Sequence, residues 1–336
     1  MLSVYGFPFL LAMLVSYILT PYIKKLAFKI GAVDRPDNRK VHKRIMPRLG
    51  GLAIYIAFMI GCVASLELTW DVCGILLGGT LIVALGVADD VYQLPAKVKL
   101  LGQIAAACVL VAFDIRIEWV NNPLGGYIYL DMLSIPWTIF WVISFTNVVN
   151  LIDGLDGLAA GVSAIASLTV ILVAIQMGYF HVAILTAALA GGIIGFIRYN
   201  FNPATIFMGD TGSMFIGYML AAISVYGAVK TAATIALIVP AIALGLPILD
   251  TAFAIMRRYA NGRPIFQPDK GHLHHRLLAQ GMSHKEAVLF MYGITAVLCI
   301  GAVLWAEMDG FYAALIIAVI MTAVAVGAKK IGILND

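Results

Sequence analysis

The chain contains 336 residues, of which 62% are hydrophobic and 12% charged, and its formal net charge is +4. Soluble domains have about 45–50% apolar and about 25% charged residues, so this composition excludes a soluble protein and indicates an integral membrane protein. Nothing in the charge pattern suggests nucleic-acid binding. The four cysteines lack metal-ligand spacing and are expected to be small apolar residues.

Apolar segments recur along the whole chain and are separated by short polar breaks. They leave no room for a separate soluble domain, so we expect one all-α domain over residues 1–336, a bundle of about eleven transmembrane helices. The predicted spans are 4–23, 50–68, 72–88, 100–116, 134–149, 158–177, 182–199, 213–229, 234–256, 287–306 and 311–328.

The distribution of basic residues predicts the orientation of this bundle. Cytoplasmic loops carry the excess of Lys and Arg, and with these spans only Arg116 and Lys230 of the 22 basic residues lie outside. The N-terminus is therefore expected outside and the C-terminus inside. The first span is not expected to be a cleavable signal peptide, because its basic cluster at Lys24 and Lys25 follows it. The main predicted cytoplasmic loops are 24–49, 89–99, 150–157, 200–212 and 257–284.

Three further patterns concern shape rather than chemistry. Alternating residues over 115–131 predict a short external β-hairpin. Small residues such as Gly191 and Gly195 predict close helix packing, either within one protomer or between the two protomers of a homodimer. Ser283 and Glu286 match a capping box that opens the tenth predicted span.

The first cytoplasmic loop, residues 24–49, combines many basic residues with Pro and Gly. Two interpretations stay open. The loop can be an orientation signal beside anionic lipid headgroups. It can also be a phosphate-binding lip, in which Arg48 faces the ligand while Gly50 and Gly51 let the backbone approach it closely.

Asp89 and Asp90 close the third predicted span, and Lys97 and Lys99 follow in the loop. The simplest interpretation is a helix end whose carboxylates pair with the lysines. Negative charge at a helix C-terminus opposes the helix dipole, however, so two adjacent aspartates there need another reason. Adjacent acids repel one another and can supply a proton acceptor, which predicts a functional site.

The third cytoplasmic loop is the densest polar stretch between two spans. Asn147, Asn150, Asp153 and Asp156 follow one another at intervals of three residues. Two Asp-Gly pairs can simply form the turn between capped helix ends. The spacing also predicts that all four side chains share one helix face and converge on one ligand. Oxygen ligands of this kind suit Mg²⁺.

Asp210 lies directly before the eighth predicted span. It can be an ordinary N-cap, or its carboxylate at a helix N-terminus can hold a cation that also touches phosphate.

The last predicted cytoplasmic loop contains His272, His274, His275 and Arg276. These histidines allow a zinc interpretation, but neither a helix nor a strand brings all three to one face. A set of contacts to phosphate or sugar is therefore the preferred interpretation.

Taken in order along the chain, these motifs resemble those of the polyprenyl-phosphate N-acetylhexosamine-1-phosphate transferases, membrane enzymes that move a sugar phosphate from a uridine diphosphate sugar to a lipid phosphate. The resemblance covers nearly the whole chain. Residues 34–42 and 47–51 resemble the branch that transfers N-acetylglucosamine 1-phosphate, which starts the wall teichoic acid linkage unit in Gram-positive bacteria. The branch that uses a muramoyl pentapeptide nucleotide has three consecutive histidines, whereas Leu273 interrupts the run here.

The resemblance implies a role for each position. Asn150 and Asp210 would bind Mg²⁺, for which Mn²⁺ could substitute. Asp89, Asp90 and Lys99 would be catalytic, with Asp89 either a base or a group that positions the lipid phosphate, and Lys99 a contact of the pyrophosphate. The implied substrate-binding residues are Arg48, Asn147, Asp153, Asp156 (near the uracil), His272, His274, His275 and Arg276.

The resemblance also implies the partners and the location. The substrates would be undecaprenyl phosphate and UDP-N-acetylglucosamine, in the plasma membrane of a bacterium, with the active site facing the cytoplasm. Two alternatives remain: the pentapeptide branch and, less favoured, a secondary transporter. Transporters usually place their carboxylates near the membrane midplane and contain repeats, whereas here most carboxylates lie at span ends and no repeat is visible.

Overall fold

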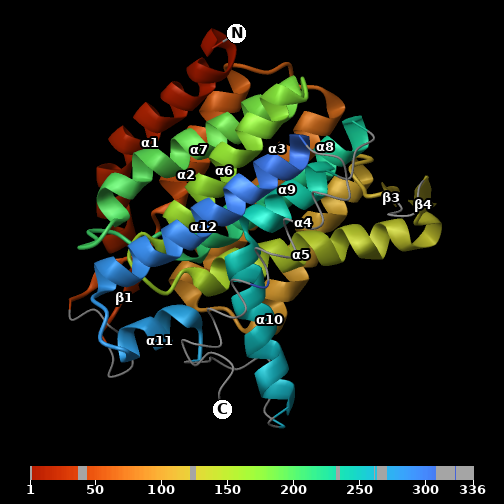
Figure 1. Cartoon of the computed structure of the whole chain (residues 1–336). Helices are drawn as coiled ribbons and strands as arrows, with labels where there is room; N and C mark the ends of the chain where they lie inside the picture. The colour runs from red at the N-terminus through yellow and green to blue at the C-terminus, as the bar shows by residue number, and fades with distance from the viewer. Residues whose placement is uncertain are drawn as a thin grey trace.

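The computed structural model describes residues 2–36, 44–121, 126–231, 235–260, 262, 271–307 and 322, which form a helical bundle (Figure 1). The helices are α1 (Leu2–Ile30), α2 (Gly51–Val63), α3 (Trp70–Tyr92), α4 (Ala96–Ala112), α5 (Ser134–Ile152), α6 (Leu158–Gln176), α7 (Phe180–Asn200), α8 (Gly209–Thr231), α9 (Ile235–Ala243), α10 (Gly245–Ala260), α11 (Leu273–Ala279) and α12 (His284–Glu307), with a 3₁₀ turn, η1 (Asp131–Leu133), before α5.

The described helices make the chain a multi-pass membrane protein. Seven of them, α1, α3, α5, α6, α7, α8 and α12, are long and apolar enough to cross a membrane, and α9 with α10 can form an eighth span. Helix α2 has only 13 residues and α4 only 17, whereas a perpendicular crossing takes about 20. Of the predicted span 311–328, only residue 322 is described. The count of eleven spans and their orientation therefore remain predictions.

The ninth predicted span differs from the expectation of one continuous helix. The chain bends by 73° between α9 and α10. Gly245 and Pro247 follow the break, and Pro247 has no backbone N–H to donate to the preceding turn. Figure 1 shows α10 pointing away from the rest of the bundle. The bend therefore carries the end of α10 out toward the segment that contains α11.

Helix α8 is the most enclosed helix of the described bundle. Its residues 211–228 are all buried, and it packs between α3 and α5. Elsewhere, Gly191 and Gly195 of α7 lie against the backbone of α1, at Phe9 and Met13. These glycines therefore serve helix packing within the chain, and a homodimer remains a prediction.

Two short antiparallel strand pairs accompany the helices. Strand β1 (Val33–Asp34) pairs with β2 (Met46–Pro47) in the first predicted cytoplasmic loop, where no strands were expected. Strand β3 (Trp119–Asn121) pairs with β4 (Tyr127–Tyr129) in the segment predicted to form a hairpin, although the residues joining them, 122–125, lie outside the described part of the chain. Next to β2, Arg48 bridges to Phe207, which places the first loop against the entrance to α8.

Candidate active site

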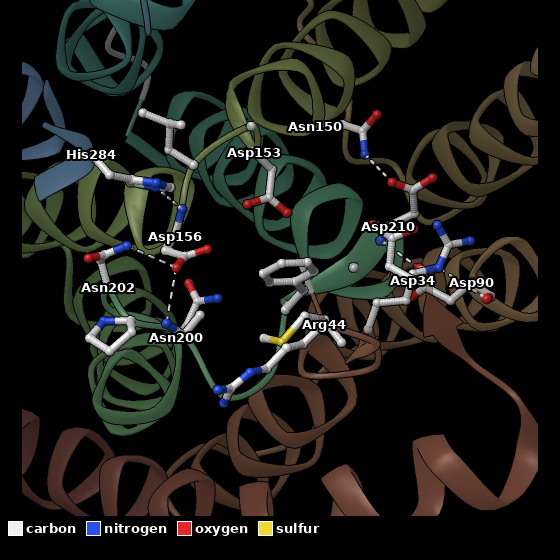
Figure 2. A pocket seen from close by; sticks show the side chains of 18 of the residues that line it. Asp34, Arg44, Asp90, Asn150, Asp153, Asp156, Asn200, Asn202, Asp210 and His284 are labelled. Atoms are coloured by element: carbon white, nitrogen blue, oxygen red, sulfur yellow. Dashed lines mark hydrogen bonds and ion pairs between the residues drawn. The ribbon is translucent and has the colours of Figure 1, made fainter. Parts of the chain in front are cut away.

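A cavity of about 690 Å³ lies where the ends of α3, α5 and α8 meet the connecting loops (Figure 2). Its lining includes seven of the residues singled out from the sequence: Arg48, Asp90, Asn150, Asp153, Asp156, Asp210 and His275. It also includes polar residues to which sequence reasoning gave no role in the site: Asn200, Asn202 and His284. Figure 2 shows Asn150 and Asp210 on one side, Asp156 and His284 on the other, and Asp153 between them.

Asp90 connects the end of α3 to the start of α8. Its Oδ1 accepts the backbone N–H of Asp210 at 3.0 Å, and its Oδ2 accepts the N–H and the hydroxyl of Thr211 at 3.0 and 2.5 Å. These donors lack partners within α8, and the positive end of the helix dipole favours a carboxylate there. Asp90 is only 2% exposed. It thus anchors α8, and Asp210 is not needed as the N-cap.

Arg48 explains how α3 tolerates two aspartates in its last turn. Its guanidinium donates from Nη2 to the backbone carbonyl of Asp89 and from Nε to that of Asp90, both at 3.2 Å. The same Nε lies 3.6 Å from Asp90 Oδ1. A cation at the carbonyl end of the helix offsets the unfavourable charge. Arg48 is therefore part of the support of this site as well as of its lining.

The contact between α3 and α8 depends on glycine at two positions. Gly209 has φ +73°, a conformation that favours glycine, and a Cβ there would lie 2.4 Å from Asp90 Oδ2. A Cβ on Gly86 would lie 2.4 Å from the Cα of Thr211. Larger residues would separate the two helix ends, so these glycines set the position of Asp210.

The carboxylate of Asp210 is shared by two side chains from other helices. Lys99 donates to Asp210 Oδ2 at 2.8 Å and to Asp89 Oδ2 at 3.0 Å. Asn150 donates to Asp210 Oδ1 at 2.7 Å and to the hydroxyl of Ser213 at 2.8 Å. Burial alone would lower the pKa of Lys99, but the carboxylates of Asp210 and Asp89 raise it above its ordinary value. Lys99 is therefore a stable cation.

Asp89 lies behind this cluster and does not line the cavity. It is 3% exposed, and its Oδ1 accepts the backbone N–H of Leu94 at 2.7 Å. Its other oxygen accepts from Lys99. Both oxygens of Asp89 therefore have donors, and the carboxylate holds Lys99 against Asp210. We call Asp89, Asp90, Lys99, Asn150 and Asp210 the helix wall of the site.

The predicted convergence of four polar side chains from one helix face is wrong. Helix α5 ends at Ile152, so Asp153 and Asp156 lie in the turn that follows it. Asn147 is on α5 but donates to Gln103 Oε1 at 2.7 Å and to the carbonyl of Ile143 at 2.8 Å, and it does not line the cavity. The helix ends early because Asp-Gly sequences favour turns.

Asp153 projects into the cavity without a side-chain partner among the described residues. Burial raises the pKa of Asp153 to about 8, with further contributions from the carboxylates of Asp210, Asp90 and Asp156. A carboxyl group whose ionisation is opposed by neighbouring acids marks a place that a cation would stabilise. Within the described chain, no three His, Cys, Asp or Glu side chains form a metal-binding group by themselves.

The turn over residues 153–157 is held by side chains from three other segments. Asp156 Oδ2 accepts from Asn202 Nδ2 at 3.2 Å and from the N–H of Ala204 at 3.0 Å. The N–H of Gly157 donates to Asn200 Oδ1 at 3.1 Å, and that of Asp156 to His284 Nε2 at 2.9 Å. We call this turn, with the residues that hold it, the turn wall of the site.

The histidine motif is only partly in the cavity. His275 lines it, whereas His272, His274 and Arg276 do not. Burial, with the neighbouring His275 as a further contribution, lowers the pKa of His274 to about 3, so this imidazole is neutral. Arg276 donates to the carbonyl of Gly271 at 3.1 Å. Of these four residues, only His275 therefore lies at the cavity in the described part of the chain, and substrate contacts by the other three remain a prediction.

Asp250 of α10 fixes the start of this motif, a contact that the sequence did not predict. Its Oδ2 lies 2.9 Å from His272 Nδ1, and its Oδ1 accepts the backbone N–H of Leu273 at 2.8 Å. Asp250 is buried. The bend before α10 thus brings a carboxylate to the segment that carries the histidines.

A multi-pass helical bundle with an acidic, lysine-supported cavity at its helix ends defines a membrane enzyme that acts on charged groups. Residues 72–228 match the family described as glycosyl transferase family 4. The chain belongs to this family, the polyprenyl-phosphate N-acetylhexosamine-1-phosphate transferases, which confirms the resemblance seen in the sequence.

Individual relatives are similar over most of the chain. A probable undecaprenyl-phosphate N-acetylglucosaminyl 1-phosphate transferase of Bacillus subtilis is 41% identical over 98% of this chain and 92% of its own length. A decaprenyl-phosphate N-acetylglucosaminephosphotransferase of Mycolicibacterium smegmatis is 38% identical over 87% of this chain and 80% of its own. A phospho-N-acetylmuramoyl-pentapeptide-transferase of a Thermoanaerobacter species is 32% identical over 86% of this chain and 93% of its own length.

Proposed function

We propose that the protein transfers N-acetylglucosamine 1-phosphate from UDP-N-acetylglucosamine to undecaprenyl phosphate and releases UMP. The observation that carries this proposal is the Asp210 carboxylate at the cavity wall, held between Lys99 and Asn150. Asp153, which has no side-chain partner among the described residues, lines the same cavity. The likeness to the Bacillus subtilis relative supports the choice of sugar and lipid. The product would enter the synthesis of teichoic acid or another cell-envelope polymer, at the cytoplasmic face of the plasma membrane.

The reaction forms one phosphorus–oxygen bond and breaks another. An oxygen of the lipid phosphate attacks the phosphorus that carries the sugar, and the bond from that phosphorus to the bridging oxygen breaks as UMP leaves. A phosphate monoester has its second pKa near 6, so most of the acceptor is already dianionic at neutral pH. The harder task is to bring two anions together, which requires cations and fixed geometry.

The chain supplies one of these cations itself. Lys99 stays protonated beside Asp89 and Asp210. When a phosphate enters, the ammonium group lies directly behind Asp210, outside the cavity lining, and can screen charge on the pyrophosphate. Asp89 holds Lys99 there, which favours a positioning role for Asp89 over that of a base. Asp90, with its oxygens occupied by α8, positions Asp210.

The donor set of the cavity fits Mg²⁺. Carboxylate and amide oxygens are its usual protein ligands, and one or two of them suffice when phosphates and water complete the coordination. Asn150 and Asp210 would hold the ion, with Asp153 beside them as the carboxylate whose ionisation it would favour. When bound, Mg²⁺ neutralises charge on the phosphates and on the departing UMP.

The turn wall is suited to the nucleotide. Asp156 Oδ2 is occupied by Asn202 and Ala204, whereas Oδ1 has no hydrogen bond within the described chain. A carboxylate oxygen presented by a rigid turn can accept from the N–H of a uracil ring. His275 reaches the same cavity and could contact phosphate or sugar.

Transfer of the muramoyl pentapeptide nucleotide is the second candidate. It is favoured by the 32% identical relative with that name, but Leu273 interrupts the histidine run that this branch contains. A transporter is less favoured still, because the polar residues of the cavity lie at helix ends and in turns.

The test is the release of UMP by purified protein with undecaprenyl phosphate, comparing the two donor nucleotides with and without a chelator. Release from UDP-N-acetylglucosamine alone, abolished by the chelator and restored by Mg²⁺, is the expected result. Release from the pentapeptide nucleotide alone would assign the chain to the second branch. Absence of release from both would contradict a transferase function with these donors.

A further inference from the structure

His284 contacts the turn wall from the first residue of α12. Its Nε2 accepts the backbone N–H of Asp156 at 2.9 Å, across a sequence separation of 128 residues. It lines the same cavity as Asp153 and Asp156. Figure 2 shows the imidazole beside Asp156, on the opposite side of the view from Asp210.

The turn has no regular secondary structure of its own to fix it. Residues 153–157 connect α5 to α6, and Gly157 has φ +80°. Within the described residues, the imidazole of His284 is the hydrogen-bond partner of the Asp156 N–H. Two turns further along α12, the hydroxyl of Tyr292 donates to the carbonyl of Gly157 at 2.5 Å. One helix therefore holds the backbone on both sides of the Asp156–Gly157 pair.

This contact requires a particular form of the imidazole. Nε2 can accept a hydrogen bond only when it carries no proton, so the ring must be neutral with its proton on Nδ1. A side chain that lacks an acceptor at this position would leave the Asp156 N–H without a partner. An unpaired amide in a partly buried site is unfavourable, and the turn can avoid that loss only by moving.

We propose that His284 is a positioning residue of the active site, which fixes the Asp156 side chain for the donor nucleotide by holding the backbone N–H of that residue. This inference rests on the proposed function, because it assigns the turn wall to the nucleotide. His284 itself exchanges no proton with the substrates. Its effect is therefore on the donor and not on the lipid phosphate.

The experiment compares His284→Leu with His284→Gln, whose Oε1 can replace the imidazole nitrogen as acceptor. In the Leu variant we expect the KM for UDP-N-acetylglucosamine to rise about tenfold, from loss of one hydrogen bond. The KM for undecaprenyl phosphate should be unchanged. The Gln variant should stay within about twofold of wild type in both constants.

The matched control is Ser283→Ala. Ser283 accepts the N–H of Glu286 at 3.3 Å and does not line the cavity. The Ser283→Ala substitution weakens the start of α12 without removing the contact to Asp156, so the donor KM of this variant should equal that of wild type. If His284→Leu does not fold, His284→Ala replaces it.

Several outcomes would overturn the inference. One is a donor KM in the Leu variant that equals that of wild type. Another is a donor KM that rises as much in the Gln variant as in the Leu variant. The third is a parallel rise, in the Leu variant, of the KM values for the donor and for undecaprenyl phosphate. Hydrogen exchange of the peptide around Asp156 separates this inference from the proposed function, since it needs no turnover. The amide should be protected in wild type and in the Gln variant and exchange faster in the Leu variant. Without that difference the positioning role fails, whichever donor the enzyme uses.

Discussion

The helix wall and the turn wall of the cavity differ in how their side chains are fixed. On the helix wall, Asp210 is placed by the end of α3 and by side chains of α4 and α5, with glycine at 86 and 209 allowing the backbones to meet. On the turn wall, Asp156 is placed by hydrogen bonds that its carboxylate accepts from loop residues and by one that its N–H donates to His284 in the first turn of α12.

This difference indicates a division of labour. Helix ends packed through glycine leave little freedom, which suits the part of the site where two phosphates must be aligned. A turn held by single hydrogen bonds can be adjusted one contact at a time, which suits recognition of a nucleotide. Changes in the helix wall should therefore reduce turnover or folding, and changes in the turn wall should mainly alter donor affinity.

The largest effect is expected from Asp210→Asn. The variant loses the charge that Lys99 and Asn150 hold at the cavity, so kcat should fall by about 10²–10³-fold, as for loss of a preorganised electrostatic contact. Asn150→Ala should act in the same direction. Melting curves should show that both variants remain folded. Wild-type turnover in either one would remove that residue as a Mg²⁺ ligand.

A second comparison separates backbone strain from the contact between α3 and α8. Gly209 and Gly178 both have φ +73°, but a Cβ would meet Asp90 only at Gly209 and meets nothing within 4 Å at Gly178. Gly178→Ala should cost about 1 kcal/mol of unfolding free energy. Gly209→Ala should cost more than about 3 kcal/mol or prevent folding, because neither Asp90 nor the backbone can yield. Equal losses of thermal stability would show that the close approach is unimportant.

A third variant tests the support of the histidine motif. Asp250→Ala leaves the Leu273 N–H and the His272 ring without their acceptor and should reduce kcat/KM about tenfold. Asp250→Asn keeps an oxygen for Leu273 and should lose less. Steady-state kinetics on both variants provide the measurement. An Asn variant as impaired as the Ala variant would indicate that the charge, and not the backbone contact, matters.

The smallest effect concerns stability and pH in the presence of chelator. The pKa of Asp153 is raised to about 8, chiefly by burial, so between about pH 4 and 8 the folded protein holds a proton that the unfolded chain has lost. This contribution to stability is present below about pH 4 and is lost as the pH rises through about 8. Asp153→Asn should therefore melt a few degrees above wild type at pH 8.5 and not at pH 4. If the two proteins differed in melting temperature by the same amount at pH 4 and pH 8.5, the raised pKa of Asp153 would be contradicted.

The local parts of this architecture could be predicted from the sequence. Each predicted span within the described residues contains a helix, and the capping box is confirmed by reciprocal hydrogen bonds between Ser283 and Glu286, at 2.8 and 3.3 Å. The family resemblance, and not a local pattern, placed Asn150 and Asp210 near one ligand, and Asn150 Nδ2 lies 2.7 Å from Asp210 Oδ1. Hydropathy, turn signals and caps act over a few residues, so the pattern in the chain is enough to reveal them.

The contacts between distant segments were settled only by the tertiary structure. Asp90 was expected to be catalytic, and the structure shows its oxygens bound by the start of α8, 120 residues away. Asn147 was expected beside Asp153, but α5 ends between them and Asn147 faces α4. The role of His284 depends on where α12 packs. Which donor meets which acceptor is set by helix packing, which brings together groups that no local pattern relates.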